Sequence, residues 1–364
     1  MSIQYHQIFP QSFKSSYLQN DVVDMVMTFE NQSMVAGSIQ ITGKLVINKA
    51  GTPIDYTNTD DVKFDSMVGI HSAFQAITCL TETGGVLENN NEYPRYVKCK
   101  AQVGFSNSQV GVESNLANEL RTGDENSTIT KALAINNGND RGISFSFQPD
   151  VAFNKSNAHI PFNKSGVMKL TLRLATNNQF LFGANMDSTY SYEIQDLQLH
   201  YRTIPQTSVK QLQFNSVESI NNTVESNNAS LATRVPAMVQ SVSCVFIREA
   251  NANQDVPNNL SLEIPPDVER VEFSFNDSTT QYISFVLEDR EEIIYNYQRS
   301  WGEKMKNNMT LELLDHSGRS YGIGLPFNQF VDMSNQKFGL NLKSSISNQD
   351  KYKIFMFFRS VKQL

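Results

Sequence analysis

Apolar and polar residues alternate with a period of two through much of the chain. The clearest stretches are 38–47, 142–147, 167–174, 192–201, 271–275, 282–287, 338–342 and 352–358. Because successive side chains of a strand point to opposite faces, this pattern predicts strands with one buried and one polar face. Such strands suit a sandwich of two packed sheets.

Two segments have apolar residues three and four positions apart instead, which predicts helices at 113–121 and 289–306. The second begins with acidic residues and ends with lysines, an order that complements the helix dipole. Its stripe includes Trp301, the only tryptophan, which we expect to anchor helix against sheet. Residues 68–80 fit either structure. We expect a strand over 74–80 that turns at Gly84-Gly85.

The chain contains an internal echo. Ile160-Pro161-Phe162-Asn163 recurs as Leu325-Pro326-Phe327-Asn328. An alternating stretch follows each copy, and a strand that opens with Tyr-x-Ile comes next, at Tyr192 and at Tyr352. The order is the same and the offsets nearly agree. This predicts two copies of one β-sandwich, 1–206 and 207–364, which are of ordinary domain size. The alternative is that an all-β chain repeats short patterns by chance.

Composition supports a folded, β-rich protein. The 364 residues are 40% hydrophobic and 18% charged, which is a globular composition, and 37 of them are asparagine, a residue that favours turns over helix. The net charge of −7 argues against a surface that wraps nucleic acid. The longest apolar runs are about five residues, too short to span a membrane. The first residues lack the features of a secretory signal.

Metal and redox chemistry have little support in the sequence. The widely spaced cysteines include no C-x-x-C pair and indicate a reducing compartment of synthesis, and the histidines include no pair at metal-ligand spacing. The residues concerned are Cys79, Cys99, Cys244, His6, His71, His159, His200 and His316.

Candidate catalytic groups also have simpler explanations. Acidic pairs occur at Asp60-Asp61, Glu288-Asp289 and Glu291-Glu292, and a glycosidase would need two carboxyls that face each other across a cleft. The last two pairs suit the first turn of a helix, where negative charge is favourable. The run 315–317 has the residue types of a catalytic triad, but sequence neighbours cannot generally point at one another. Gly322-Ile323-Gly324 lacks the rest of a dinucleotide loop and indicates a strand with close backbone approach. We assign no catalytic, cofactor-binding or metal-binding residue and expect no enzyme and no cofactor.

One local pattern points to a family. Residues 69–75, GIHSAFQ, are followed by an apolar strand, a Gly-Gly turn and residues 91–96, NEYPRY. This stretch resembles the His-Ser-x-Phe … Tyr-Pro-Arg/Tyr pattern of capsid proteins in the Polinton-like group. The whole chain, with its two predicted sandwiches, resembles the double jelly-roll major capsid proteins of tailless phages, virophages and adenovirus-type viruses.

The resemblance implies an all-β fold of two consecutive jelly rolls with short helices in loops. It implies a homotrimer that fills a six-fold position of an icosahedral shell, with neighbouring trimers, penton and minor capsid proteins as further partners. It implies no direct sequence-specific contact with nucleic acid and no transmembrane segment. The protein would be made in the host cytoplasm and reside in the virion.

Two alternatives stay open at this stage. One is a penton, or vertex, capsid protein with one jelly roll and a different second β domain. The other is a receptor- or glycan-binding β-sandwich of a viral spike, for which a shallow aromatic-lined site is expected. A glycan hydrolase on a β-sandwich has the least support.

Overall fold

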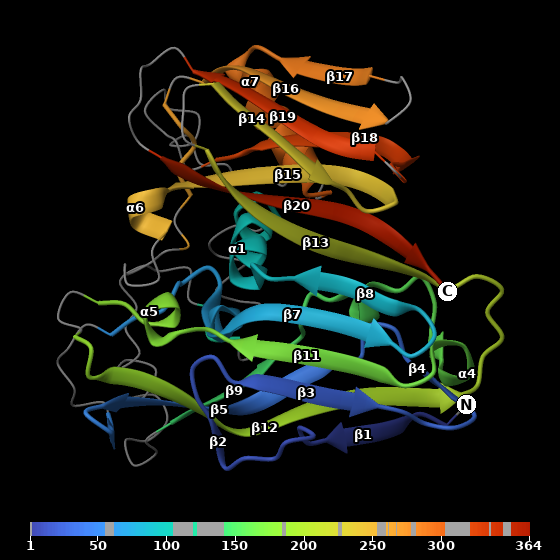
Figure 1. The fold of residues 1–364 in the computed structure, drawn as a ribbon. Coiled ribbons are helices and arrows are strands. Elements are labelled where there is room, and N and C mark those ends of the chain that lie inside the picture. Colours follow the sequence, from blue (N-terminus) through green and yellow to red (C-terminus); the bar gives the residue numbers. More distant parts are fainter. Residues whose placement is uncertain are drawn as a thin grey trace.

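The computed structural model describes residues 2–54, 62–104, 119–121, 142–183, 187–224, 228–252, 260, 262–266, 268–277, 282–302, 321–334, 336–344 and 351–364. Strands dominate these residues (Figure 1). In the first part of the chain the strands are β1 (Gln4–Ile8), β2 (Ser16–Tyr17), β3 (Val22–Met27), β4 (Gln32–Met34), β5 (Gln40–Lys49), β6 (Thr52–Pro53), β7 (Phe74–Thr81), β8 (Gly85–Asn90), β9 (Ile143–Phe147), β10 (Ile160–Pro161), β11 (Met168–Leu174) and β12 (Tyr190–Pro205).

Among the described residues, the second part contributes eight strands. They are β13 (Gln213–Val224), β14 (Asn228–Arg234), β15 (Met238–Arg248), β16 (Val268–Asp277), β17 (Tyr282–Leu287), β18 (Ile323–Asp332), β19 (Gln336–Ser344) and β20 (Tyr352–Gln363). The helices of the described residues are η1 (Gly69–Ala73), α1 (Tyr93–Gly104), η2 (Ala152–Lys155), α4 (Phe162–Ser165), α5 (Asn177–Phe180), α6 (Glu249–Ala252) and α7 (Arg290–Ser300).

Both halves have the same strand order. If the main strands of each half are numbered one to eight along the chain, one sheet runs first, eighth, third, sixth and the other runs second, seventh, fourth, fifth. In the first half these sheets are β1-β12-β5-β9 and β3-β11-β7-β8. In the second half they are β13-β20-β15-β18 and β14-β19-β16-β17. This is the double-sheet order of a jelly roll, and it confirms the expected fold of two consecutive jelly rolls.

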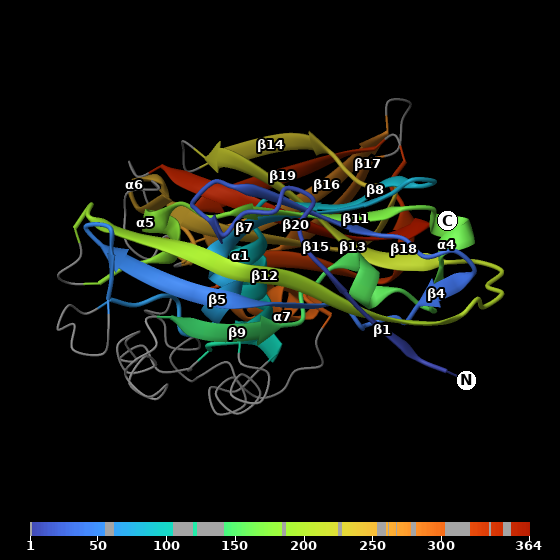
Figure 2. The ribbon, with the colours of Figure 1, turned by 90° about the horizontal axis from the view of Figure 1, so that it is seen from below.

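One sheet is shared between the halves. The strands β3-β11-β7-β8 of the first jelly roll continue into β13-β20-β15-β18 of the second, in a sheet of 8 strands that we call the long sheet. The seam is parallel and pairs Asn89 with Glu218. The two remaining sheets lie on opposite sides of the long sheet (Figure 2). The halves are therefore fixed edge to edge by backbone hydrogen bonds.

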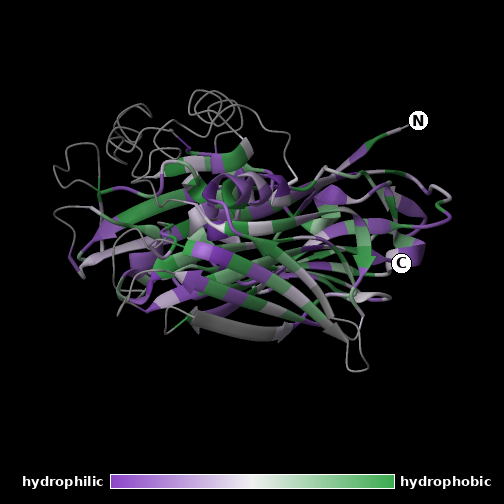
Figure 3. Cartoon of the chain, turned by 90° about the horizontal axis from the view of Figure 1, so that it is seen from above, coloured by the Kyte–Doolittle hydropathy of each residue, from purple (hydrophilic) through white to green (hydrophobic). Residues whose placement is uncertain are grey.

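Strand β20 is buried on both of its faces. The ring of Phe358 meets Phe338 of β19 at 5.4 Å, inside the second sandwich. The next ring along the chain, Phe357, lies on the other face, 5.6 Å from Trp301 at the end of α7. This explains why residues 352–358 are nearly continuous in apolar character. Strands with one face in water alternate instead, which Figure 3 shows as purple and green bands along strands.

The predicted strands are all confirmed, with ends shifted by a few residues, and so is the strand at 74–80 with its turn before Gly85. The predicted boundary between residues 206 and 207 falls between β12 and β13 and stays a prediction.

The predicted helices fare less well. Helix α7 ends at Ser300 because Gly302 has φ of 72°, a left-handed residue that stops helices; residues 303–306 lie outside the described residues. Of the predicted helix 113–121, only 119–121 are described, and Leu120 with φ of 58° is not helical. The helix of the first half is instead α1, which the sequence analysis missed. In each half the long helix follows the fifth strand.

Only part of the internal echo corresponds to equivalent positions in the two jelly rolls. The strands that follow each copy are equivalent, because β11 and β19 are both seventh strands and β12 and β20 both eighth. The four-residue matches are not equivalent. Ile160–Asn163 leaves short strand β10 for a helical turn, whereas Leu325–Asn328 lies within β18, a sixth strand.

Two glycines at the start of β18 allow close packing, Gly322 against β15 and Gly324 against α7. A Cβ at Gly322 would come within 2.2 Å of the carbonyl oxygen of Cys244, and one at Gly324 within 2.2 Å of Ser300 Oγ. The predicted close backbone approach at 322–324 is thus confirmed.

Substitution of Gly322 by Ala should therefore destabilise the protein strongly. The added Cβ meets backbone that cannot move without disturbing β15, so we expect a loss of about 3 kcal/mol in unfolding free energy. Gly51→Ala is the control, since nothing lies within 4 Å of its Cβ and its φ of 77° is the only strain. It should cost about 1 kcal/mol. Thermal or denaturant unfolding of both variants measures the difference, and equal losses would contradict this account of the packing.

Candidate functional site

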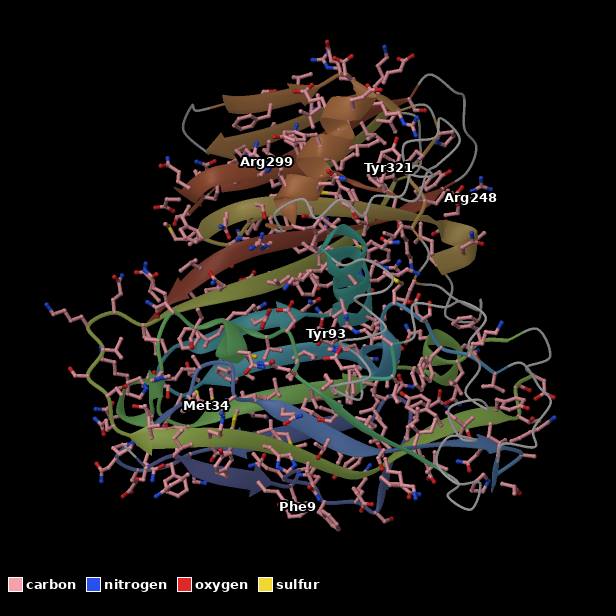
Figure 4. All side chains as sticks on the ribbon, turned by 180° about the vertical axis from the view of Figure 1, so that it is seen from behind. Phe9, Met34, Tyr93, Arg248, Arg299 and Tyr321 are labelled. Carbon is pink, nitrogen blue, oxygen red and sulfur yellow. The ribbon has the colours of Figure 1, made fainter. Side chains whose placement is uncertain are left out.

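A cluster of paired polar side chains lies where the two jelly rolls meet, around α1. The first residue of this helix, Tyr93, is labelled in Figure 4. This junction brings together residues 69–75 and 91–96, the two stretches of the local sequence pattern. The Nδ1 atom of His71, in η1, lies 2.7 Å from the hydroxyl oxygen of Tyr93, at the start of α1. Both side chains are buried. The pattern noticed in the sequence thus fastens α1 to the first jelly roll.

The same helix also contacts the second jelly roll. The guanidinium of Arg95 lies 4.1 Å from the centroid of the Phe355 ring of β20. The next residue, Tyr96, is 5.8 Å from the rings of both Phe357 and Trp301. Trp301 is therefore a packing anchor between α7, α1 and β20, as expected from the sequence. Helix α1 therefore lies between the two jelly rolls and contacts both.

A buried carboxylate ties the seam of the long sheet together. Glu88 of β8 is 1% exposed. Its Oε1 accepts a hydrogen bond of 3.1 Å from the backbone N–H of Val217 in β13, and its Oε2 accepts one of 2.5 Å from the N–H of Ala152 in η2. Lys155 Nζ is 3.5 Å from Oε1. One side chain thus binds backbone from both halves.

Lys155 pairs with Asp150 as well as with Glu88. Its Nζ is 2.8 Å from Asp150 Oδ1, while Lys100 Nζ of α1 is 2.7 Å from Oδ2. The Tyr96 hydroxyl donates to the same Oδ2 at 3.3 Å. Two carboxylates and two ammonium groups therefore balance one another, which the low dielectric of a protein interior requires.

The pKa values of these groups follow from burial and pairing. Burial raises the pKa of Glu88, which Lys155 and the two N–H donors only partly offset. Burial alone would raise the pKa of Asp150 as well, but Lys155 and Lys100 outweigh it and hold that pKa well below its usual range. The pKa of Lys155 is raised because Asp150 and Glu88 outweigh the effect of its burial. At neutral pH the Asp150–Lys155 pair is charged.

Further contacts fix η2 and its following residues on β13. The N–H of Gln213 donates to Asn157 Oδ1 at 2.9 Å, and the N–H of Asn157 donates to the carbonyl oxygen of Gln213 at 3.0 Å. The rings of Phe153 and Phe214 meet edge to face at 6.4 Å. These contacts, like those of Glu88, hold the halves at a set angle.

His71 has a second set of partners. Its Nε2 lies 3.0 Å from an Arg121 amino group and 3.6 Å from Glu119 Oε2. Burial lowers the pKa of His71, and the nearby Arg121 lowers it further, so the ring is neutral at pH 7. A neutral ring accepts a hydrogen bond from Arg121 and donates one to Tyr93. The ring thus orders 119–121 against η1.

The candidate groups of the sequence analysis do not converge on a reaction centre. Glu291 and Glu292 occupy the first turn of α7, as expected. The runs 60–61 and 315–317 lie outside the described residues. Cys79, Cys99 and Cys244 are buried and unpaired thiols. Among the described residues no three His, Cys, Asp or Glu side chains gather as a metal site, and no helix is long and apolar enough to cross a membrane.

A surface hollow of about 460 Å³ lies beside β1 and β12. Its lining includes Tyr5, His6, Tyr201 and Glu119. The His6 ring stacks on Tyr201 with 4.8 Å between centroids, which leaves Tyr201 3% exposed. The ring that a sugar would need is therefore already covered, although Tyr5 remains open.

Sequence reasoning missed the junction residues Glu88, Asp150 and Lys155, because Glu88 is distant in the sequence from the other two and only the fold brings them together. The helix α1 had a signal that could have been used. Pro94 suits the first turn of a helix, and Tyr93, Tyr96 and Val97 repeat at helical spacing.

Solved structures of several virus capsid proteins have a similar fold. The Faustovirus major capsid protein matches with a TM-score of 0.64 and 8% identity, over 100% of this chain and 90% of that one. A chain of the Sputnik virophage matches at 0.54 and 9% identity, over 100% and 86%. The STIV major capsid protein matches at 0.50 and 9% identity, over 99% and 97%. No protein-family profile and no curated protein sequence matches the chain. The chain therefore has the double jelly-roll fold of these proteins.

Substitution of Asp150 by Asn should loosen the junction. It leaves the partly buried Lys155 and Lys100 without their shared partner, so we expect a loss of about 3 kcal/mol in unfolding free energy at pH 7. Because the pKa of Asp150 is depressed, its contribution is present above the ordinary value of 3.8 and is lost as the pH falls through the folded-state pKa. The difference in unfolding free energy between wild type and variant should therefore become smaller in acid.

The control is Asp24→Asn, which removes a surface ion pair with Lys169 of the same 2.8 Å length. Surface pairs contribute little, so this variant should lose less than about 1 kcal/mol. Chemical denaturation between neutral and acidic pH measures both. If the Asp150 variant were as stable as the control, the ion pairs of Asp150 would not be what stabilises the junction.

Proposed function

We propose that the chain is a structural subunit of an icosahedral virus shell, a major capsid protein that assembles as a trimer. The observation that carries the proposal is the double jelly-roll strand order over the whole chain, together with its match to the Faustovirus major capsid protein. Such a protein acts by burying surface between neighbouring subunits of the shell.

The geometry of the subunit supports a trimer with six similar sides. The units 1–206 and 207–364 supply two similar sandwiches per chain, so three chains supply six and fill a six-fold lattice position with a three-fold object. The rigid junction around Glu88 and α1 suits this role, because a lattice position requires a fixed angle between the two sandwiches.

The same reasoning gives the expected surroundings. The partners are further copies of the chain, neighbouring trimers, and penton and minor capsid proteins, and the place of the protein is the virion after synthesis in the host cytoplasm. The buried charges of the junction pair with one another and with backbone, which supports a non-enzymatic protein without a cofactor.

The alternatives have less support. A penton with a different second β domain does not fit a second half that repeats the strand order of the first. A glycan-binding spike would need an open aromatic platform, and in the hollow beside β1 the Tyr201 ring is covered by His6.

Size-exclusion chromatography with light scattering tests the proposal directly. The purified chain should elute at three times the subunit mass of 41.0 kDa, and electron microscopy should show three-fold particles with a six-sided outline. A pentamer would favour the vertex role. A monomer at every concentration reached would refute the proposal.

A further inference from the structure

The hollow beside β1 and β12 gathers side chains from one face of a sheet. Strand β1 lies at the bottom of Figure 1, paired with β12. Tyr5 of β1 stands opposite Arg202 of β12, and His200 of β12 stands opposite Gln40 of β5. Opposite residues of antiparallel strands share a face, and so do residues two positions apart, such as 200 and 202. These four side chains therefore lie on one face, and all four line the hollow.

Arg202 brings a positive charge to this hollow. It is the only lysine or arginine among the described residues that line it. Its side chain is half-buried, and no carboxylate of the described residues pairs with it. A guanidinium presents parallel N–H groups that match a carboxylate, and arginines that are removed from water usually have such a partner. The guanidinium of Arg202 is therefore available to an anionic ligand.

Tyr5 gives the hollow one open aromatic ring, since its side chain is 78% exposed. Opposite residues of an antiparallel pair have Cβ atoms about 5 Å apart, so the ring of Tyr5 and the guanidinium of Arg202 can contact the same small ligand. Tyr201 adds no second ring, because His6 covers it. Ring stacking alone therefore does not hold a ligand in this hollow, and the charge of Arg202 decides what binds.

Two amide side chains of the hollow are held in place by hydrogen bonds within the protein. Gln148 Nε2 donates to the carbonyl oxygen of Gly37 at 2.7 Å, and Gln40 Nε2 donates to the hydroxyl oxygen of Ser146. Because the amide nitrogens already have partners, the amide oxygens are left to accept hydrogen bonds from a ligand. Side chains that are already ordered lose little conformational entropy when a ligand binds.

Glu119 also lines the hollow, but its charge is already balanced. Its Oε2 lies 3.0 Å from Arg121 Nε and 3.6 Å from His71 Nε2, and the carboxylate accepts a hydrogen bond from the backbone N–H of Gln148. A carboxylate with these partners does not cancel the charge of Arg202. The hollow therefore combines one unpaired cation with several groups that accept hydrogen bonds.

This combination matches a sugar that carries a carboxylate. The carboxylate suits the guanidinium, the apolar face of the sugar ring suits the Tyr5 ring, and sugar hydroxyls donate to amide oxygens. Inorganic phosphate offers mainly acceptor oxygens, which find no donor in the oxygens of Gln40 and Gln148. At about 460 Å³ the hollow has the usual size of a site for a small ligand.

We propose that this hollow binds an acidic sugar unit of a glycan, with the sugar carboxylate on Arg202 and the sugar ring on Tyr5. The binding itself goes beyond the proposed function and does not depend on the trimer. Its use by a virus particle rests on the proposed function: many copies of one weak site on a shell would attach the particle to a surface that displays acidic glycans.

Titration calorimetry with small probes tests the ligand class. The acidic probes are the methyl glycosides of glucuronic acid and of N-acetylneuraminic acid, which distinguish the two common kinds of acidic sugar. The neutral control is methyl glucoside, which differs from the glucuronide in its carboxylate. We expect at least one acidic probe to bind about tenfold or more tightly than methyl glucoside, because a hydrogen-bonded ion pair is lost with the carboxylate. If neither acidic probe binds better than methyl glucoside, the proposal is wrong.

Two variants with matched controls locate the site. Arg202→Gln should weaken binding of the acidic probe about tenfold or more, whereas Arg173→Gln, an exposed arginine of β11 outside the hollow, should leave it unchanged. Tyr5→Ala should weaken binding about fivefold, whereas Tyr295→Ala, which removes an exposed ring of α7, should not. Unchanged melting temperatures show that the variants are folded, and the Tyr5 variant tests the site even if the Arg202 variant is unstable.

The remaining outcomes separate this inference from the proposed function. Equal losses in the Arg202 and Arg173 variants would show attraction to overall charge and overturn the site. Inorganic phosphate that displaces the acidic probe at equal concentration would show a general anion site, which also overturns the proposal. A trimeric wild type that binds neither acidic probe would refute the sugar site alone. A monomeric wild type that binds an acidic probe through Arg202 would support the site and refute the trimer.

Discussion

The architecture depends on a charge that is buried where two sheets become one. Glu88 accepts hydrogen bonds from backbone N–H groups of both jelly rolls, and beside it Asn89 and Glu218 form the parallel pair at the seam. A carboxylate removed from water is costly unless its oxygens are bonded and its charge is paired, and both conditions are met only when η2 and β13 are in place. The penalty for a wrong angle between the halves is thus large. Apolar packing alone would penalise small rotations less sharply.

Helix α1 converts that local constraint into a global one. It is fastened to the first half through Tyr93 and to the second through Arg95 and Tyr96, so neither sandwich can rotate without breaking contacts on the other side. The helix α7 occupies the corresponding place in the second half, after the fifth strand, and the two helices meet at Trp301. The repeated strand order therefore has a repeated helix, and the pair forms the second layer of the junction.

The sequence was a good guide to strands and a poor guide to the junction. Alternation gave the strands because a half-buried strand is decided locally, by which of its faces meets water. The two jelly rolls were also foreseen, although part of the reason was coincidental: Tyr192 and Tyr352 open equivalent strands, whereas Pro161 and Pro326 do not occupy equivalent positions. Long-range pairing could not be foreseen. Nothing near Glu88 in the sequence shows that its partners come from residues 150–155 and from Val217.

The two-sided burial of β20 bears on how the molecule is made. This strand inserts between β13 and β15 and also supplies Phe355 and Phe357 to the helices of both halves, yet the ribosome delivers it after all of them. The second sandwich and the joint with the first must therefore wait, with their hydrophobic faces uncovered, until translation has passed residue 352. Such late, non-local closure is slow. It also means that a nascent chain has no completed second barrel to offer to its neighbours before β20 has been synthesised.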